Sequence, residues 1–124
     1  GEVSIDGALS PYGITTMQLA ILAVVHKGDA DTATGLCRRI PCSAGAMTRL
    51  LDRLQQKGLI VRSTYEGDRR AHRLALSGEA RGMLPMALKA SEAVLGRILG
   101  GFDLDDLQQL ESLLFRMNAP GPRK

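Results

Sequence analysis

The segment from Ser43 to Ser77 constrains the fold of this chain more than any other, because it joins a helix pattern directly to a hairpin pattern. Its first part carries four apolar residues at the i, i+3, i+4, i+7 spacing of a single helix face, namely Met47, Leu50, Leu51 and Leu54. Its second part reads as two short strands, 60–64 and 71–76, separated by a polar and basic tip at 65–70. The segment therefore predicts one amphipathic helix followed at once by a β-hairpin.

The ends and the polar face of this helix indicate what it can contact. Ser43 is placed to cap the N-terminus by accepting a backbone N–H, and Gly58 is placed to stop the C-terminus. The face opposite the apolar stripe carries Thr48, Arg49 and Arg53. A helix fits the major groove of DNA, and a basic hairpin beside it can reach the neighbouring minor groove or backbone. The predicted fold class is thus mainly α with a small β-wing, a winged helix-turn-helix.

Charge is concentrated in the same part of the chain. Residues 26–73 hold ten Lys/Arg and five Asp/Glu, whereas the rest of the chain holds six Lys/Arg and eight Asp/Glu. A polyanion-binding face needs such a local basic excess. A solvated face on a basic protein would show the same charge pattern, so charge alone leaves both interpretations open.

Further helices are expected on both sides of this segment. The spacing predicts helices at about 15–27 and 32–40, then a long helix from Ser77 to about 99 and a last helix from Asp103. The long helix has a coiled-coil-like 4,3 seam and an internal Pro85. Residues 1–13 are expected to be a loop or a frayed terminus, and a short third strand of the wing sheet is expected near 30–32.

Several classes of function are disfavoured by what the sequence lacks. No apolar run approaches the roughly 20 residues that cross a bilayer, and no signal segment is apparent, so the expected location is the cytoplasm, without membrane contact. The two histidines, His26 and His72, have no Cys or acid at metal-ligand spacing, so neither a metal site nor a cofactor is expected. Ser43, Asp68 and His72 lie on elements that do not converge, so an enzyme is not expected.

At this point the sequence resembles the MarR family of bacterial winged-helix regulators. The wing has Asp68-x-Arg70, five residues, then Leu76-Ser77, where the family has D-x-R, five residues, L-T. The preceding DRLQQKGLIVR is similar to the family's D-R-L-E-x-x-G-L stretch, and residues 11–15 resemble the entry to its second helix. The resemblance spans about 12–117, nearly the whole chain.

The resemblance implies a single domain over 1–124, with a DNA-binding core at about 30–77 and dimerisation helices at about 78–118. It implies a homodimer that binds a pseudo-palindromic operator in double-stranded DNA, usually as a repressor, and in many members a small aromatic or phenolic ligand relieves the binding. Carried over by position, the recognition-helix contacts are Ser43, Ala44, Gly45, Thr48 and Arg49, with Arg53 beside them. In the wing, the minor-groove arginine is Arg70, with Asp68 orienting it and Arg69 contacting phosphate.

Two departures from the family pattern keep a second function open. The family's long first helix is absent or reduced to residues 1–10, so either the sequence starts inside it or the dimer relies on the last two helices. The tip of the recognition helix is Ala44-Gly45-Ala46, where polar residues are usual, so backbone contacts and DNA shape would carry more of the specificity. The alternative is a winged-helix interaction or dimerisation module that does not read DNA.

The two cysteines are weighed in the same way. Cys37 falls on the inward face of the 32–40 helix and is expected to be a buried, inert thiol, whereas Cys42 lies in a turn and is expected to be partly exposed. The oxidant-sensing members of the family place their cysteine near the N-terminus, so a redox role is the less favoured interpretation here.

Overall fold

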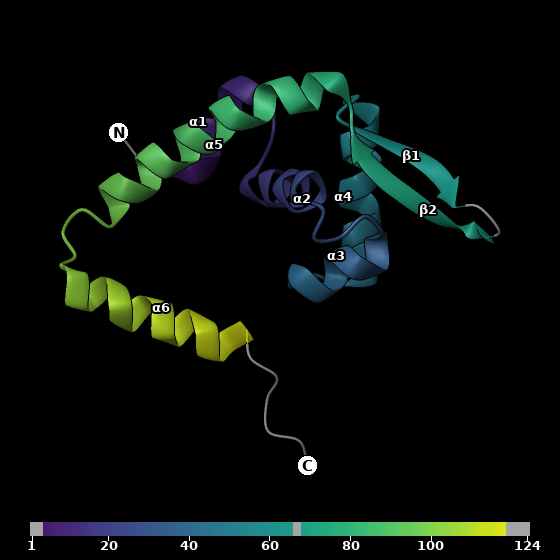
Figure 1. The fold of residues 1–124 in the computed structure, drawn as a ribbon. Helices are drawn as coiled ribbons and strands as arrows, with labels where there is room; N and C mark the ends of the chain where they lie inside the picture. The colour runs from purple at the N-terminus through teal and green to yellow at the C-terminus, as the bar shows by residue number, and fades with distance from the viewer. Residues whose placement is uncertain (1–3, 66–67, 119–124) are drawn as a thin grey trace, which may run out of the picture.

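The computed structural model describes residues 4–65 and 68–118, with the backbone alone described at residues 65, 68–71, 117 and 118. Figure 1 shows a helical body with a two-stranded wing on one side and a last helix that stands apart. This arrangement confirms the predicted fold class, mainly α with a small β-wing. The elements in chain order are α1 (Ile5–Leu9), the 3-10 turn η1 (Ser10–Tyr12), α2 (Thr16–Lys27), α3 (Ala33–Arg39), α4 (Ala44–Gln56), β1 (Ile60–Tyr65), β2 (Asp68–Leu76), α5 (Gly78–Ile98) and α6 (Leu104–Asn118).

Helix α2 forms the centre of the body, as its apolar composition requires. The Thr15 hydroxyl caps it by accepting the Gln18 N–H at 3.3 Å, and Oε1 of Gln18 accepts the Thr15 N–H at 3.0 Å. This reciprocal pair is a capping box, and it satisfies two backbone donors at once. The helix ends at Gly28, whose φ of 85° suits a residue without a side chain. The core that surrounds α2 is formed by Leu9, Leu19, Ile21, Leu22, Leu36, Met47, Leu51, Leu54, Ile60 and Leu84.

Helices α3 and α4 form the helix-turn-helix. Thr32 caps α3 through the Gly35 N–H, and Ser43 caps α4 through the Ala46 N–H, at 3.0 and 3.1 Å. The predicted stripe of α4 faces the core, although Leu50 at its edge is only half-buried. Beyond α4, Gly58 takes φ 72° and the Leu59 N–H donates to the Leu54 carbonyl at 2.9 Å. That left-handed turn aims the chain directly into β1.

The wing is an antiparallel pair in which Ile60 lies opposite Leu76, with an irregularity between Thr64 and Tyr65. Its strands are longer than predicted, because residue 65 pairs with residue 68 and residues 69–70 belong to β2 instead of the tip. Only residues 66–67 separate the strands, and they lie outside the described part of the chain. An antiparallel ladder can close over a two-residue connection, and here the pair formed by residues 65 and 68 flanks it.

The predicted third strand near 30–32 is wrong. Within the described ranges the sheet has two strands. The Leu74 N–H does donate to the Asp31 carbonyl at 2.7 Å, so the chain approaches β2 where the strand was expected. A single bond of this kind ties the segment to the wing without building a ladder.

The prediction of a loop at 1–13 is also wrong, since α1 and η1 occupy most of it. Ser4 caps α1 through the Gly7 N–H at 3.0 Å, and Leu9 is fully buried against the core. The Asp6 carboxylate accepts from both the backbone N–H and the hydroxyl of Thr16 at the start of α2. A five-residue helix is marginal by itself, so these tertiary contacts stabilise it.

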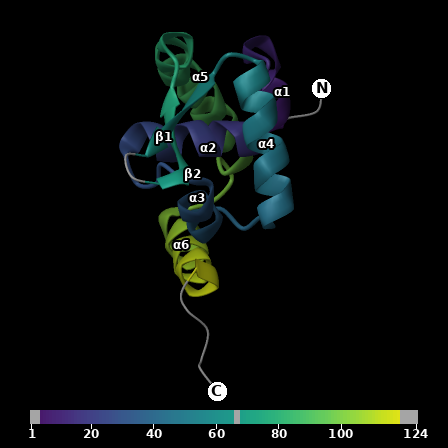
Figure 2. The ribbon, with the colours of Figure 1, turned by 90° about the vertical axis from the view of Figure 1, so that its right-hand side faces the viewer.

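Helices α5 and α6 divide the remaining apolar residues unequally. The predicted seam of α5 is buried at Leu84 and half-buried at Leu88, but Leu95 and Ile98 are exposed. Helix α6 begins with a reciprocal cap between Asp103 and Asp106, at 2.8 and 3.0 Å, and it lies away from the core in both views (Figures 1 and 2). Its apolar residues therefore face solvent in the isolated protomer.

No single helix in the described ranges is long and apolar enough to cross a membrane. The bent pair Ile5–Tyr12 and Thr16–Lys27, at 69° to each other, meets that requirement together, by length and composition alone.

Candidate nucleic-acid interface

The solvent face of α4 presents the predicted contact residues along one side of the helix. Ser43, Ala44, Gly45, Thr48, Arg49 and Arg53 are all exposed. The Thr48 hydroxyl donates to the Ala44 carbonyl one turn earlier, at 3.0 Å. This bond uses the hydroxyl proton inside the helix and leaves both lone pairs of the oxygen able to accept a hydrogen bond.

The Arg49 side chain lies close to Gly45 in the first turn of α4. A Cβ at that position would lie 3.6 Å from Nη1 of Arg49, which is ordinary contact distance. The Arg49 guanidinium therefore lies back over the N-terminal turn. The small residues at the tip, Ala44 and Gly45, leave this guanidinium as the bulkiest polar group there.

The acid nearest to these arginines is engaged elsewhere. Asp52 pairs with Arg62 of β1 at 3.1 Å, and this ion pair joins α4 to the wing. In the described part of the chain, no ion pair or side-chain hydrogen bond involves Arg49 or Arg53. An exposed pair such as Asp52–Arg62 contributes at most about 1 kcal/mol. Its larger consequence is that two guanidinium groups remain available on the α4 face.

The wing residues are placed by their backbone alone. Asp68, Arg69 and Arg70 begin β2 beside the end of β1, while their side chains lie outside the described atoms. The structure thus puts these residues at the far end of the hairpin in Figure 1, on the same side of the body as α4. The backbone of the predicted wing contacts therefore lies in the hairpin, as expected.

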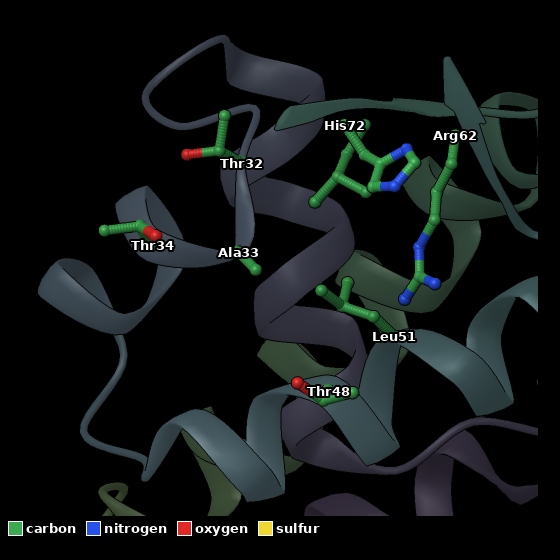
Figure 3. A pocket seen from close by; sticks show the side chains of 8 residues that line it. Thr32, Ala33, Thr34, Thr48, Leu51, Arg62 and His72 are labelled. Carbon is green, nitrogen blue, oxygen red and sulfur yellow. The ribbon is translucent and has the colours of Figure 1, made fainter. Parts of the chain in front are cut away.

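A cavity of about 360 Å³ lies between the start of α3, the middle of α4 and the base of the wing. Figure 3 shows the Arg62 guanidinium directed toward Leu51, with the His72 ring above it and Thr48 on the opposite wall. The sequence pattern did not point to Arg62 or His72, because their strand positions meet α3 and α4 only after folding. The full lining is Thr32, Ala33, Thr34, Thr48, Leu51, Arg62, His72 and Leu74.

The burial of Cys37 differs from the expectation drawn from the sequence. Cys37 is half-buried instead of fully buried, and Cys42, also half-buried, donates its thiol to the Ser43 carbonyl at 3.3 Å. Both thiols are free. In residues 4–65 and 68–118, no three His, Cys, Asp or Glu side chains gather in a group that could hold a metal ion.

Comparison with known proteins gives one family and several similar structures. The model of the MarR family matches residues 12–71. A MarR variant from Escherichia coli, complexed with operator DNA, is similar over 91% of this chain and 81% of its own, at 24% identity and a TM-score of 0.82. CouR from Rhodococcus jostii RHA1, bound to p-coumaroyl-CoA, is similar over 97% and 84%, at 21% identity and a TM-score of 0.81. A MarR-family transcriptional regulator from Rhodococcus sp. RHA1 is similar over 94% and 83%, at 22% identity and a TM-score of 0.78.

The family match covers the helix-turn-helix and the outer part of the wing, and the fold of the remaining helices agrees with it. The resemblance drawn from the wing and recognition-helix residues is therefore confirmed. MarR-family proteins are transcriptional regulators and not enzymes, in agreement with the expectation from the sequence. Residues 12–71, just under half of the chain, thus match the MarR family of transcriptional regulators, and the fold of nearly the whole chain is that of solved MarR-family structures.

Proposed function

We propose that the chain acts as a homodimer that binds a pseudo-palindromic operator, with α4 in the major groove and the wing in the minor groove. The observation that carries this proposal is the outer face of α4, where Arg49 and Arg53 are exposed and have no acidic partner among the described residues. The similarity to the MarR variant that was solved with operator DNA supports DNA binding by this chain.

The proposed contacts divide into positioning and readout. Arg49 lies over the first turn, where a helix end meets the base edges, so we assign it to a base or a flanking phosphate. Arg53 lies one turn further along and is assigned to phosphate. Ser43, Ala44 and Gly45 bring the helix backbone close to the DNA, and specificity there rests on DNA shape. In the wing we keep the family roles: Arg70 in the minor groove, Asp68 orienting it and Arg69 on phosphate.

The dimer is assigned to the end of α5 and to α6. Among the residues with described side chains, these helices carry the largest group of exposed apolar side chains, and exposure of apolar surface to water costs about 25 cal/mol per Å². A twofold arrangement would cover the same stripe on both protomers. The single domain 1–124 then divides into a DNA-binding core at about 30–77 and dimerisation helices at about 78–118. The exposed apolar residues are Leu95, Ile98, Phe102, Leu104, Leu107, Leu113, Leu114 and Phe115.

We further propose a repressor that is relieved by a small aromatic or phenolic effector, bound in the cavity beside α4. The cavity offers apolar walls, the Arg62 guanidinium and the His72 ring, a combination that suits an aromatic ring bearing an anionic group. Such a ligand would compete with Asp52 for Arg62, whose side chain is 25% exposed. Because Thr48 belongs both to the cavity wall and to the DNA face, occupancy would alter that face directly.

The operator is tested by fluorescence anisotropy with DNA that flanks the protein's own gene, at several salt concentrations. We expect nanomolar binding and a log–log salt slope near −5, if about six phosphates are neutralised. The Arg49→Ala/Arg70→Ala variant should lose most of this affinity, whereas Lys89→Ala/Arg97→Ala, the same loss of two charges but on α5, should retain it. Retained binding by the double variant would refute the site assignment.

The effector is tested in the same assay by adding phenolic acids. An effector of the proposed kind should raise the operator Kd of the wild type but not that of Arg62→Ala. If the effector still releases operator DNA from Arg62→Ala, its site lies outside this cavity.

A second candidate function is a winged-helix module that docks a protein partner without reading DNA. The Ala44-Gly45-Ala46 tip favours it, since it offers no polar side chain to a base edge. In that case genomic selection should enrich no DNA site, and Arg70→Ala should leave partner binding intact.

A further inference from the structure

Lys57 continues the basic row of α4 in sequence but not in space. It follows Arg49 and Arg53 at i+8 and i+4, so helical spacing alone predicts a third cation on the DNA-facing side. Exposed lysines at the end of a recognition helix are plausible phosphate ligands. The structure directs this lysine elsewhere.

The Lys57 ammonium bonds to the corner that leads into α2. Its Nζ donates to the Gly13 carbonyl at 2.6 Å and to Oε1 of Gln18 at 3.0 Å. These partners lie 44 and 39 residues earlier in the chain. Hydrogen bonds from a charged donor are stronger than those between neutral groups. The ammonium is therefore engaged by the protein itself.

Both acceptors are fixed. Gly13 has φ 68°, a left-handed conformation that aims its carbonyl out of the turn between η1 and α2. Gln18 is the one buried polar side chain in the described ranges, with 2% of its surface exposed. Its Oε1 also accepts the Thr15 N–H at 3.0 Å, so the capping box of α2 holds the amide in place. The acceptor pair is thus preorganised before Lys57 arrives.

We propose that Lys57 is a positioning residue that sets the orientation of α4 against the α1–α2 corner and contacts no phosphate. This rests on the proposed DNA-binding function. Apolar packing between α4 and the core is non-directional, so it resists separation of the helices more than rotation about their contact. A directional, charged bond at the C-terminus of α4 fixes that rotation, while the short link from α3 restrains the N-terminus. A change in tilt would displace the row formed by Gly45, Arg49 and Arg53 from the groove.

The test compares Lys57→Met with Arg53→Met, which removes the same charge from a proposed phosphate contact. Operator affinity is measured over a range of salt, at a temperature at which circular dichroism shows each variant fully folded. For Arg53→Met we expect the magnitude of the log–log slope to fall by about 1.8, one phosphate in each of two protomers. For Lys57→Met we expect about a tenfold loss of affinity at every salt concentration with an unchanged slope. A slope that falls as it does for Arg53→Met would overturn the proposal.

A purely structural role predicts a different result. In that case Lys57→Met would lower the melting temperature but bind the operator like the wild type once folded, and this outcome would also overturn the proposal. A double-mutant cycle with Gln18→Met measures the coupling between Lys57 and Gln18. Together the two substitutions should lower the melting temperature by clearly less than the sum of their single effects. Additive shifts would contradict the proposed contact.

Failure of the DNA-binding function is distinguishable from failure of this inference. If the wild type binds no operator, the proposed function fails. The thermal cycle then still reports whether Lys57 and Gln18 are coupled, and amide exchange at the end of α4 reports whether their bond orders that helix. Uncoupled substitutions together with unchanged exchange would refute the anchor by itself.

Discussion

The body and the last helix use the same kinds of residue in opposite ways. From α1 to the middle of α5, the leucines, isoleucines and methionines of the stripes mostly point into one core, and Leu9, Leu22 and Met47 are fully buried. From Leu95 to residue 116 most apolar residues are exposed, with Leu104 at 72% and Phe115 at 75%. An amphipathic helix of this composition is stable only when its stripe is covered. The contrast teaches that the body can be folded by its own contacts, whereas α6 needs a partner.

The largest expected effect comes from charging the stripe of α6. In a twofold dimer Leu114→Asp acts twice, and each buried leucine contributes about 1.5–3 kcal/mol. The variant should weaken the dimer by about 10²- to 10⁴-fold, which sedimentation equilibrium measures. Ser112→Asp, on the other side of the same helix, is the control and should leave the dimer intact. An unaffected dimer in the Leu114 variant would place the interface elsewhere.

A substitution in the core tests the contrast between the buried body and the exposed α6. Leu22 is fully buried in α2, so Leu22→Ala should lower the free energy of unfolding by about 2–5 kcal/mol through lost burial and a residual cavity. Urea denaturation of the dimer-deficient Leu114→Asp background isolates the body for this measurement. In that background Leu107→Ala should change the body's stability by less than about 0.5 kcal/mol. Equal losses at the two sites would erase the distinction between body and last helix.

A smaller effect is expected at the turn that joins α4 to the wing. Gly58 has φ 72°, and its nearest outside heavy atom, Oε2 of Glu79, lies 3.9 Å from a Cβ built there, so a side chain would fit but the backbone would be strained. Gly58→Ala should cost about 1–2 kcal/mol of stability, and Gly58→Asn should cost less because asparagine tolerates the left-handed region. Thermal unfolding of both variants measures the difference. Equal costs would show that space, and not φ, limits this position.

The smallest effect concerns α1, which the contact between Asp6 and Thr16 joins to the body. The hydroxyl and backbone N–H of Thr16 bond to the Asp6 carboxylate and hold the pKa of Asp6 below its ordinary value of 3.8. A lowered pKa favours the folded state above pH 3.8, and this stabilisation is lost as the pH falls through the folded-state pKa. Asp6→Asn should therefore melt slightly below the wild type near neutrality, with a gap that narrows in acid. A gap that widens in acid would contradict the contact.

Much of the fold could be predicted because its signals are local. Thr15 with Gln18, Thr32, Ser43 and Ser77 begin their helices where side chain and backbone are close neighbours in sequence, and the α4 stripe repeats within two turns. The candidate recognition face followed from the same periodicity. Short elements were predicted less well, since α1 depends on Leu9 packing into the core and on a carboxylate bond to α2 that spans ten residues.

The sequence by itself determined the helical register, the caps, the winged helix-turn-helix and the face of α4 that carries Arg49 and Arg53. Only the tertiary structure decided where the charges of that region go: Asp52 to Arg62, and Lys57 to Gly13 and Gln18. Helical spacing fixes which residues share a face, because an α-helix makes one turn every 3.6 residues. It cannot fix the partners of long, flexible charged side chains, because those partners are supplied by segments that come close only when the chain has folded.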